Sequence, residues 1–211
     1  MASQNDRGPR HFSMLRSFHL ADAFTLANGF LGAAAVLSFM RFTIDNQKGF
    51  FWLATALLPV ALVMDALDGR IARRRGMASP LGQELDSLAD IVSFGVAPAA
   101  MAFAAGLRGG WDALFLIYFV CCGISRLARY NVSASAAAAT ASKVTYFEGF
   151  PIPSSLLLVG MLAALAGLER WQDQLPFGAV SFAGMTLHPL ALVFGLHGSA
   201  MISKTLRIPK P

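Results

Sequence analysis

The sequence predicts an all-α, polytopic membrane protein that forms a single domain over residues 1–211. Two observations support this fold class. Hydrophobic residues make up 55% of the chain and charged residues only 14%, whereas charged residues are near 25% in soluble domains. The apolar residues also gather in six stretches joined by short segments, so the sequence shows no linker between domains.

Each apolar stretch is close to the length of about 20 residues that a helix needs to cross a bilayer. We expect transmembrane helices over residues 20–42, 50–70, 86–107, 112–130, 150–168 and 177–201. The alanine-rich segment 133–142 lies between the fourth and fifth stretches, and we expect a loop or a frayed helix end there.

The segment before the first stretch mixes basic and apolar residues over positions 9–20. This pattern predicts an amphipathic helix on the inner leaflet, and it makes residues 1–19 a cytoplasmic or interfacial segment. A disordered basic arm is the alternative.

Basic residues predict the orientation. With the N-terminus in the cytoplasm, 13 of the 17 lysines and arginines lie inside and four lie outside, as the positive-inside rule requires. We therefore expect an integral protein of the inner (cytoplasmic) membrane, with both termini and the active site on the cytoplasmic side. Basic flanks and anionic lipids explain the net charge of +5, so we expect no nucleic-acid partner.

Four aspartates lie at the cytoplasmic ends of the second and third expected helices. Asp65 and Asp68 are three residues apart, and Asp86 and Asp90 are four apart, so each pair shares one helix face. The short connection between the helices predicts an antiparallel hairpin in which the two pairs face each other. A carboxylate in or beside a membrane helix is costly, roughly 2.5–3.5 kcal/mol at the helix centre on insertion scales. A cation, proton or substrate is therefore expected to offset the charge.

The ligand types indicate the cation. All-oxygen ligation suits Mg²⁺ or Mn²⁺ and not Zn²⁺, and four carboxylates are enough for two ions that clamp a transferring phosphoryl group. The small residues Gly69, Ala72 and Gly82 leave room for a bulky ligand between the helices. Close helix packing is the alternative interpretation of these small residues.

Arg126 and Arg129 share one face at the cytoplasmic end of the fourth expected helix. We expect them to bind an anion, either a lipid phosphate or the carboxylate of an acceptor. The alternative is a basic flank that reaches toward the lipid headgroups.

The aspartate segment resembles the CDP-alcohol phosphotransferase family. The family signature is D-x2-D-G-x2-A-R, then about eight residues, then G-x3-D-x3-D. Every defined position is filled in this chain, by Asp65, Asp68, Gly69, Ala72, Arg73, Gly82, Asp86 and Asp90. The resemblance extends over nearly the whole chain, because the family also has six membrane helices.

The resemblance implies a reaction and a role for each residue. Asp65, Asp68 and Asp86 would hold the metal ions, and Asp90 would act as general base and also touch a metal. CDP-diacylglycerol would bind as phosphatidyl donor, with CMP as leaving group. Its nucleotide pocket would be lined by Asn28, Gly69, Ala72, Arg73 and Gly82.

Four further segments, 21–28, 90–98, 125–131 and 147–153, resemble the family members that use L-serine as acceptor. Membership also implies a homodimer. Two alternatives remain open. The first is the same chemistry with glycerol phosphate, inositol phosphate or choline as acceptor. The second is a cation transporter whose aspartates carry ions, although no further acidic residues continue a path across the membrane.

Overall fold

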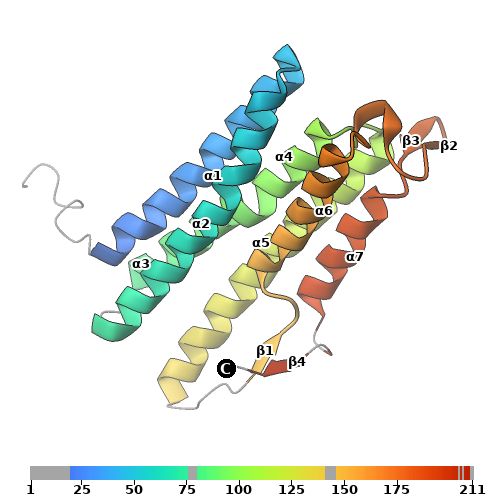
Figure 1. Cartoon of the computed structure of the whole chain (residues 1–211). Helices are drawn as coiled ribbons and strands as arrows, with labels where there is room; N and C mark the ends of the chain where they lie inside the picture. Colours follow the sequence, from blue (N-terminus) through green and yellow to red (C-terminus); the bar gives the residue numbers. More distant parts are fainter. Residues whose placement is uncertain (1–19, 76–79, 141–145, 204, 206, 210–211) are drawn as a thin grey trace, which may run out of the picture.

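The computed structural model describes residues 20–75, 80–140, 146–203, 205 and 207–209. These residues form a bundle of long helices with two small two-stranded sheets (Figure 1). In chain order the elements are α1 (Leu20–Asp45), α2 (Lys48–Arg75), α3 (Pro80–Asp90), the π-helix η2 (Ile91–Val96), α4 (Ala97–Ala104), α5 (Gly110–Thr140), β1 (Tyr146–Glu148), the 3₁₀ helix η3 (Ile152–Ser155), α6 (Leu156–Gly167), the 3₁₀ helix η4 (Gln172–Gln174), β2 (Val180–Phe182), β3 (Met185–Leu187), α7 (Ala191–Ile202) and β4 (Arg207–Pro209).

Four of the described helical segments are long and apolar enough to cross a membrane: Asp22–Asp45, Lys48–Ile71, Leu81–Ala104 and Gly110–Ser133. They match the first four expected spans. Large apolar side chains on α1, among them Phe30 and Ile44, are 73% and 76% exposed. Such an outer surface suits lipid rather than water, and together with the long apolar helices it identifies an integral membrane protein.

The fifth and sixth expected spans correspond to shorter apolar helices, Ile152–Gly167 and Ala191–Ile202. A helix rises about 1.5 Å per residue, so both are shorter than the roughly 30 Å of bilayer hydrocarbon. The number of complete crossings therefore stays a prediction. The expected interfacial helix over residues 9–20 lies outside the described residues, except for Leu20, which begins α1.

The first half of the sixth expected span is a β-hairpin, so our expectation of a helix from residue 177 is wrong. Val180 pairs with Leu187 and Phe182 with Met185. The two-residue loop between the strands, Ala183 and Gly184, has φ angles of +50° and +75°. Two positive φ angles are typical of a tight hairpin turn, and the helix begins only at Ala191.

The alanine-rich segment is helical as far as Thr140, where α5 ends, and the two residues after it lie outside the described part of the chain. The third expected span is also less regular than predicted, since the π-helix η2 interrupts it directly after Asp90.

α1 packs along α2 and also contacts α3, η2 and α4. At the end where α1 passes into α2, the rings of Phe42 and Phe51 pack against Trp171 with centroid distances of 5.3 and 5.0 Å. Lys48 Nζ lies 2.8 Å from both carboxylate oxygens of Glu169, and this bond lowers the pKa of Glu169. The β2–β3 hairpin lies at this end, and α3 and the β1–β4 pair lie toward the opposite end (Figure 1).

Candidate active site

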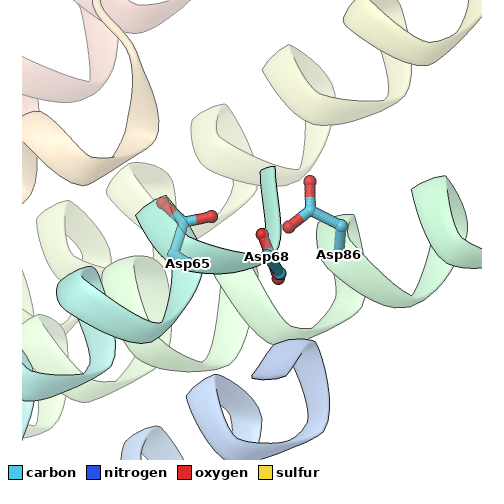
Figure 2. A group of neighbouring side chains, drawn as sticks. All are labelled: Asp65, Asp68 and Asp86. Carbon is cyan, nitrogen blue, oxygen red and sulfur yellow. The ribbon is translucent and has the colours of Figure 1, made fainter. Parts of the chain in front are cut away.

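Three aspartates converge where the last turns of α2 meet α3. Asp65 and Asp68 come from α2 and Asp86 from α3, and their carboxylates point into the same space (Figure 2). One oxygen from each residue lies within 4.8 Å of the others. The expected clustering of the two helices' carboxylates is therefore confirmed for these three residues.

The cluster has the properties of a cation site. Asp68 is 6% exposed, and the Oδ1 atom of Asp86 is buried without a hydrogen-bond partner. Among the side chains that the structure describes, which do not include those of residues 72–80, no lysine or arginine forms an ion pair with the three carboxylates. An orphaned acceptor among converging carboxylates fits a hard divalent cation, because such ions prefer oxygen ligands.

α1 supplies polar side chains to the aspartates. Thr25 Oγ1 donates to Asp68 Oδ2 at 2.7 Å, and Asn28 Nδ2 donates to Asp90 Oδ1 at 3.1 Å. Thr25 was assigned no role from the sequence. The sequence signal for it is a polar face on an apolar helix, because Asp22, Thr25 and Asn28 recur every three residues. That signal does not identify the residue that each side chain contacts.

Asp90 is not part of the group formed by the other three aspartates. It is 7% exposed, close enough to interact electrostatically with them, and held by Asn28. The chain beyond it turns into η2, where Ser93 Oγ donates to the Asn28 carbonyl at 2.9 Å. A π-turn inside a helix is often found at functional sites, and here Asn28 contacts both Asp90 and the π-turn.

α5 borders the site on another side. Arg126 is half-buried, packs on the Tyr130 ring and interacts electrostatically with Asp90. Arg129 instead donates to the Ile202 carbonyl at 3.2 Å. Arg126 thus interacts with Asp90, whereas Arg129 bonds to the end of α7. Their expected shared role in anion binding stays a prediction.

A side-chain network aligns α5 with α3. Asn131 Oδ1 accepts from Gln83 Nε2 at 3.2 Å, and Asn131 Nδ2 donates to Ser87 Oγ at 3.0 Å. Because Ser87 directly follows Asp86, this network helps to set the position of α3 in the site.

The remaining predicted residues lie on the same two helices. Gly69 follows Asp68 in α2 and Gly82 precedes Asp86 in α3, and both are half-buried. Ala72 and Arg73 lie in the last turns of α2, and their side chains are outside the described part of the chain.

Comparison with known proteins identifies the family. Residues 18–197 match the family model of CDP-alcohol phosphatidyltransferase. The chain is 46% identical over 204 residues to CDP-diacylglycerol–serine O-phosphatidyltransferase of Saccharomyces cerevisiae, which covers 95% of this chain and 74% of that protein.

Proteins with the same name in Mycobacterium leprae and Methanocaldococcus jannaschii are 40% and 34% identical over 137 and 150 residues. These matches cover 63% and 71% of this chain and 44% and 63% of those proteins. Parts of these two relatives therefore have no counterpart in the match. The family model matches far more than half of the chain, so the chain belongs to the CDP-alcohol phosphatidyltransferase family.

Proposed function

We propose that this protein is a CDP-diacylglycerol–serine O-phosphatidyltransferase that transfers the phosphatidyl group of CDP-diacylglycerol to L-serine and releases CMP. The observation that carries the proposal is the group of three carboxylates within 4.8 Å, with Asp90 beside it. The name shared by the relatives supports the choice of donor and acceptor.

Asp65, Asp68 and Asp86 would hold Mg²⁺ or Mn²⁺, and together with Asp90 they offer enough oxygens for two ions. Bound divalent cations would neutralise charge on the phosphoryl oxygens of the donor. Asn28, Gly69, Ala72, Arg73 and Gly82 are the proposed contacts of CDP-diacylglycerol.

Asp90 is the proposed general base. The serine hydroxyl is a weak nucleophile, so its proton must be removed as it attacks. The new bond joins the serine oxygen to the phosphorus that carries diacylglycerol, and the bond from that phosphorus to the CMP oxygen breaks. Asp90 Oδ1 already accepts a hydrogen bond from Asn28. We therefore assign the serine hydroxyl proton to Asp90 Oδ2.

Arg126 is the proposed contact of the acceptor carboxylate or of the lipid phosphate. A cation in this position orients an anion and helps to balance the aspartates. Arg129 is the weaker candidate for this anion contact, because its guanidinium already bonds to the Ile202 carbonyl.

The proposed setting follows from the charge distribution and the family. Residues 1–211 form one domain in the inner (cytoplasmic) membrane, with the termini and the aspartates on the cytoplasmic side and residues 1–19 at the interface. Six membrane helices and a homodimer complete the proposal. The site then lies at the boundary where a lipid donor and a water-soluble acceptor meet.

An acceptor screen tests the function. Purified protein in detergent is given CDP-diacylglycerol and Mg²⁺ or Mn²⁺, and CMP release is measured with L-serine, glycerol phosphate, inositol phosphate, choline or no acceptor. We expect CMP release and phosphatidylserine formation with L-serine. Release with another acceptor alone would refute the serine assignment, and ion flux in liposomes without CMP release would support a transporter.

Metal removal tests the cofactor. EDTA is expected to stop CMP release, and added Mg²⁺ or Mn²⁺ is expected to restore it better than Zn²⁺. The reason is that, among the residues that the structure describes, the group of candidate ligands consists of carboxylates without His or Cys. Full activity of a metal-stripped sample would contradict the metal assignment.

A further inference from the structure

A serine–histidine pair, with the histidine buried and the serine half-buried, lies outside the aspartate cluster. Ser154 Oγ is 2.6 Å from the Pro151 carbonyl and 3.1 Å from His197 Nε2. A serine hydroxyl has a single proton, and the carbonyl can only accept. Ser154 therefore donates to Pro151 and accepts from His197, which fixes a proton on Nε2.

His197 lies in apolar surroundings, so its hydrogen bond to Ser154 contributes to stability. His197 is 8% exposed, and the rings of Phe119 and Phe150 each lie 5.8 Å from its own ring. A polar group in such an apolar place is costly unless it is hydrogen-bonded. The bond to Ser154 satisfies the Nε2 proton and joins α7 to η3.

η3 carries the side chain that reaches toward the site. Ile152 is fully buried, and its Cδ1 and that of Ile91 both lie next to Gly123, 3.0 and 3.1 Å from where a Cβ would be. Ile91 directly follows Asp90. Gly123 is three residues before Arg126 on α5, so both lie on one helix face.

The end of α7 holds the neighbouring segments as well. The Phe150 amide donates to the Ala200 carbonyl at 3.2 Å, and Arg129 donates to the Ile202 carbonyl at 3.2 Å. α7 thus holds both the chain that enters η3 and the helix that carries Arg126.

We propose that His197 and Ser154 are a positioning pair for the acceptor side of the active site. His197 holds η3 through Ser154, and η3 holds Ile152 beside Ile91 against Gly123. This contact sets the spacing between Asp90 and Arg126. The inference rests on the proposed function, and it takes Arg126, together with Asp90, as a contact of the acceptor rather than of the lipid phosphate. The metal-binding aspartates meet the donor.

The test compares His197→Phe, which keeps a ring and removes the N–H, with His197→Gln, which restores an N–H donor. We expect His197→Phe to lower kcat/KM for L-serine roughly fivefold to tenfold, the value of one buried hydrogen bond. The KM for CDP-diacylglycerol is expected to stay within about twofold of wild type. His197→Gln is expected to recover most of the loss.

Ser154→Ala is expected to reproduce the loss of His197→Phe, and the double variant is expected to lose no more than either single one, because the two residues act through one bond. Ser199→Ala is the matched control. The Ser199 hydroxyl bonds to the Gly195 carbonyl within α7 at 2.9 Å and to the Tyr118 hydroxyl of α5 at 3.1 Å, and neither bond reaches η3. Unfolding midpoints in detergent are measured for all variants. If His197→Phe does not fold, the proposal is tested with Ser154→Ala, which is expected to lose activity, and His197→Gln, which is expected to keep most of it.

Three results would refute the positioning role of the pair. They are equal losses of kcat/KM for L-serine in His197→Gln and His197→Phe, additive losses in the double variant, or a rise in the KM for CDP-diacylglycerol of the same size. A wild-type protein that ignores serine and uses another acceptor would refute the proposed function alone. The same variants assayed with that acceptor would then still test the pair.

Discussion

Asp86 lies half-buried opposite Asp65 and Asp68, and its Oδ1 atom has no hydrogen-bond partner. Replacing any of the three by asparagine keeps the shape and removes one negative ligand. We expect each variant to lose CMP release and to need more Mg²⁺ or Mn²⁺ for any residual activity. A metal titration of CMP release checks this, and near-wild-type turnover of any one variant at saturating metal would contradict the metal assignment.

Asp90 differs from the other three because Asn28 binds it and it lies outside their group. We expect Asp90→Asn to lower turnover by about 10²–10⁴-fold, the usual contribution of a general base. Metal affinity and CDP-diacylglycerol binding are expected to stay close to wild type. If metal affinity falls together with turnover, Asp90 is chiefly a ligand, and retained turnover would exclude both roles.

At the residue scale, the sequence predicted the cluster because helical spacing fixes which carboxylates share a face. It did not predict how α1 contributes. Thr25 contacts Asp68 across 43 positions of sequence, and such a contact depends on how α1 packs against α2 rather than on local spacing. For the same reason, the bond from Arg129 to the Ile202 carbonyl could not be predicted, because it depends on where α7 ends.

At the element scale, close contact between α1 and η2 holds Asp90 in place. A Cβ atom at Gly32 would lie 2.8 Å from Ser93 Cα and 2.9 Å from Ser93 N. Those are backbone atoms of the π-helix, so the two segments would have to separate. Ser93 also bonds to the Asn28 carbonyl, and separation would break that bond.

We therefore expect Gly32→Ala to destabilise the protein by about 1–3 kcal/mol and to reduce turnover by displacing Asp90. Gly160→Ala is the matched control, because Gly160 is an exposed helical glycine with nothing within 4 Å of the added Cβ. Unfolding midpoints and CMP release are compared for the two variants. Equal unfolding midpoints and equal CMP release in the two variants would show that α1 and η2 are not in close contact.

The elements that were not expected have physical explanations. The hairpin alternates apolar and polar residues over Val180–Phe182 and Met185–Leu187, which is a strand pattern. Because these residues are mostly apolar, they also fit the composition of a membrane helix, which is why a helix was expected. The π-helix η2 has no recognisable sequence pattern, because a π-turn depends on packing and its residues also suit an α-helix.

At the scale of the whole molecule, the two ends of the bundle differ. α3, which carries Asp86 and Asp90, lies toward one end, and the β2–β3 hairpin lies at the other (Figure 1). At the hairpin end, the fully buried Asp112 accepts from His188 N at 2.7 Å and contacts His188 Nδ1 at 2.6 Å. Trp111 Nε1 donates to the Phe182 carbonyl at 2.9 Å. The hairpin is therefore firmly held against α5.

This separation makes the proposed orientation testable. Ser181 in the hairpin and Thr205 beyond α7 are both exposed, and they lie toward opposite ends. Each is replaced by cysteine in a background with Cys121→Ala and Cys122→Ala, and intact spheroplasts are treated with a membrane-impermeant maleimide. If the aspartates face the cytoplasm, as the distribution of lysine and arginine predicts, Ser181→Cys is labelled in intact spheroplasts and Thr205→Cys only after permeabilisation. The reverse pattern would place the aspartates outside, away from cytoplasmic substrates, and would refute both the orientation and the cytoplasmic active site.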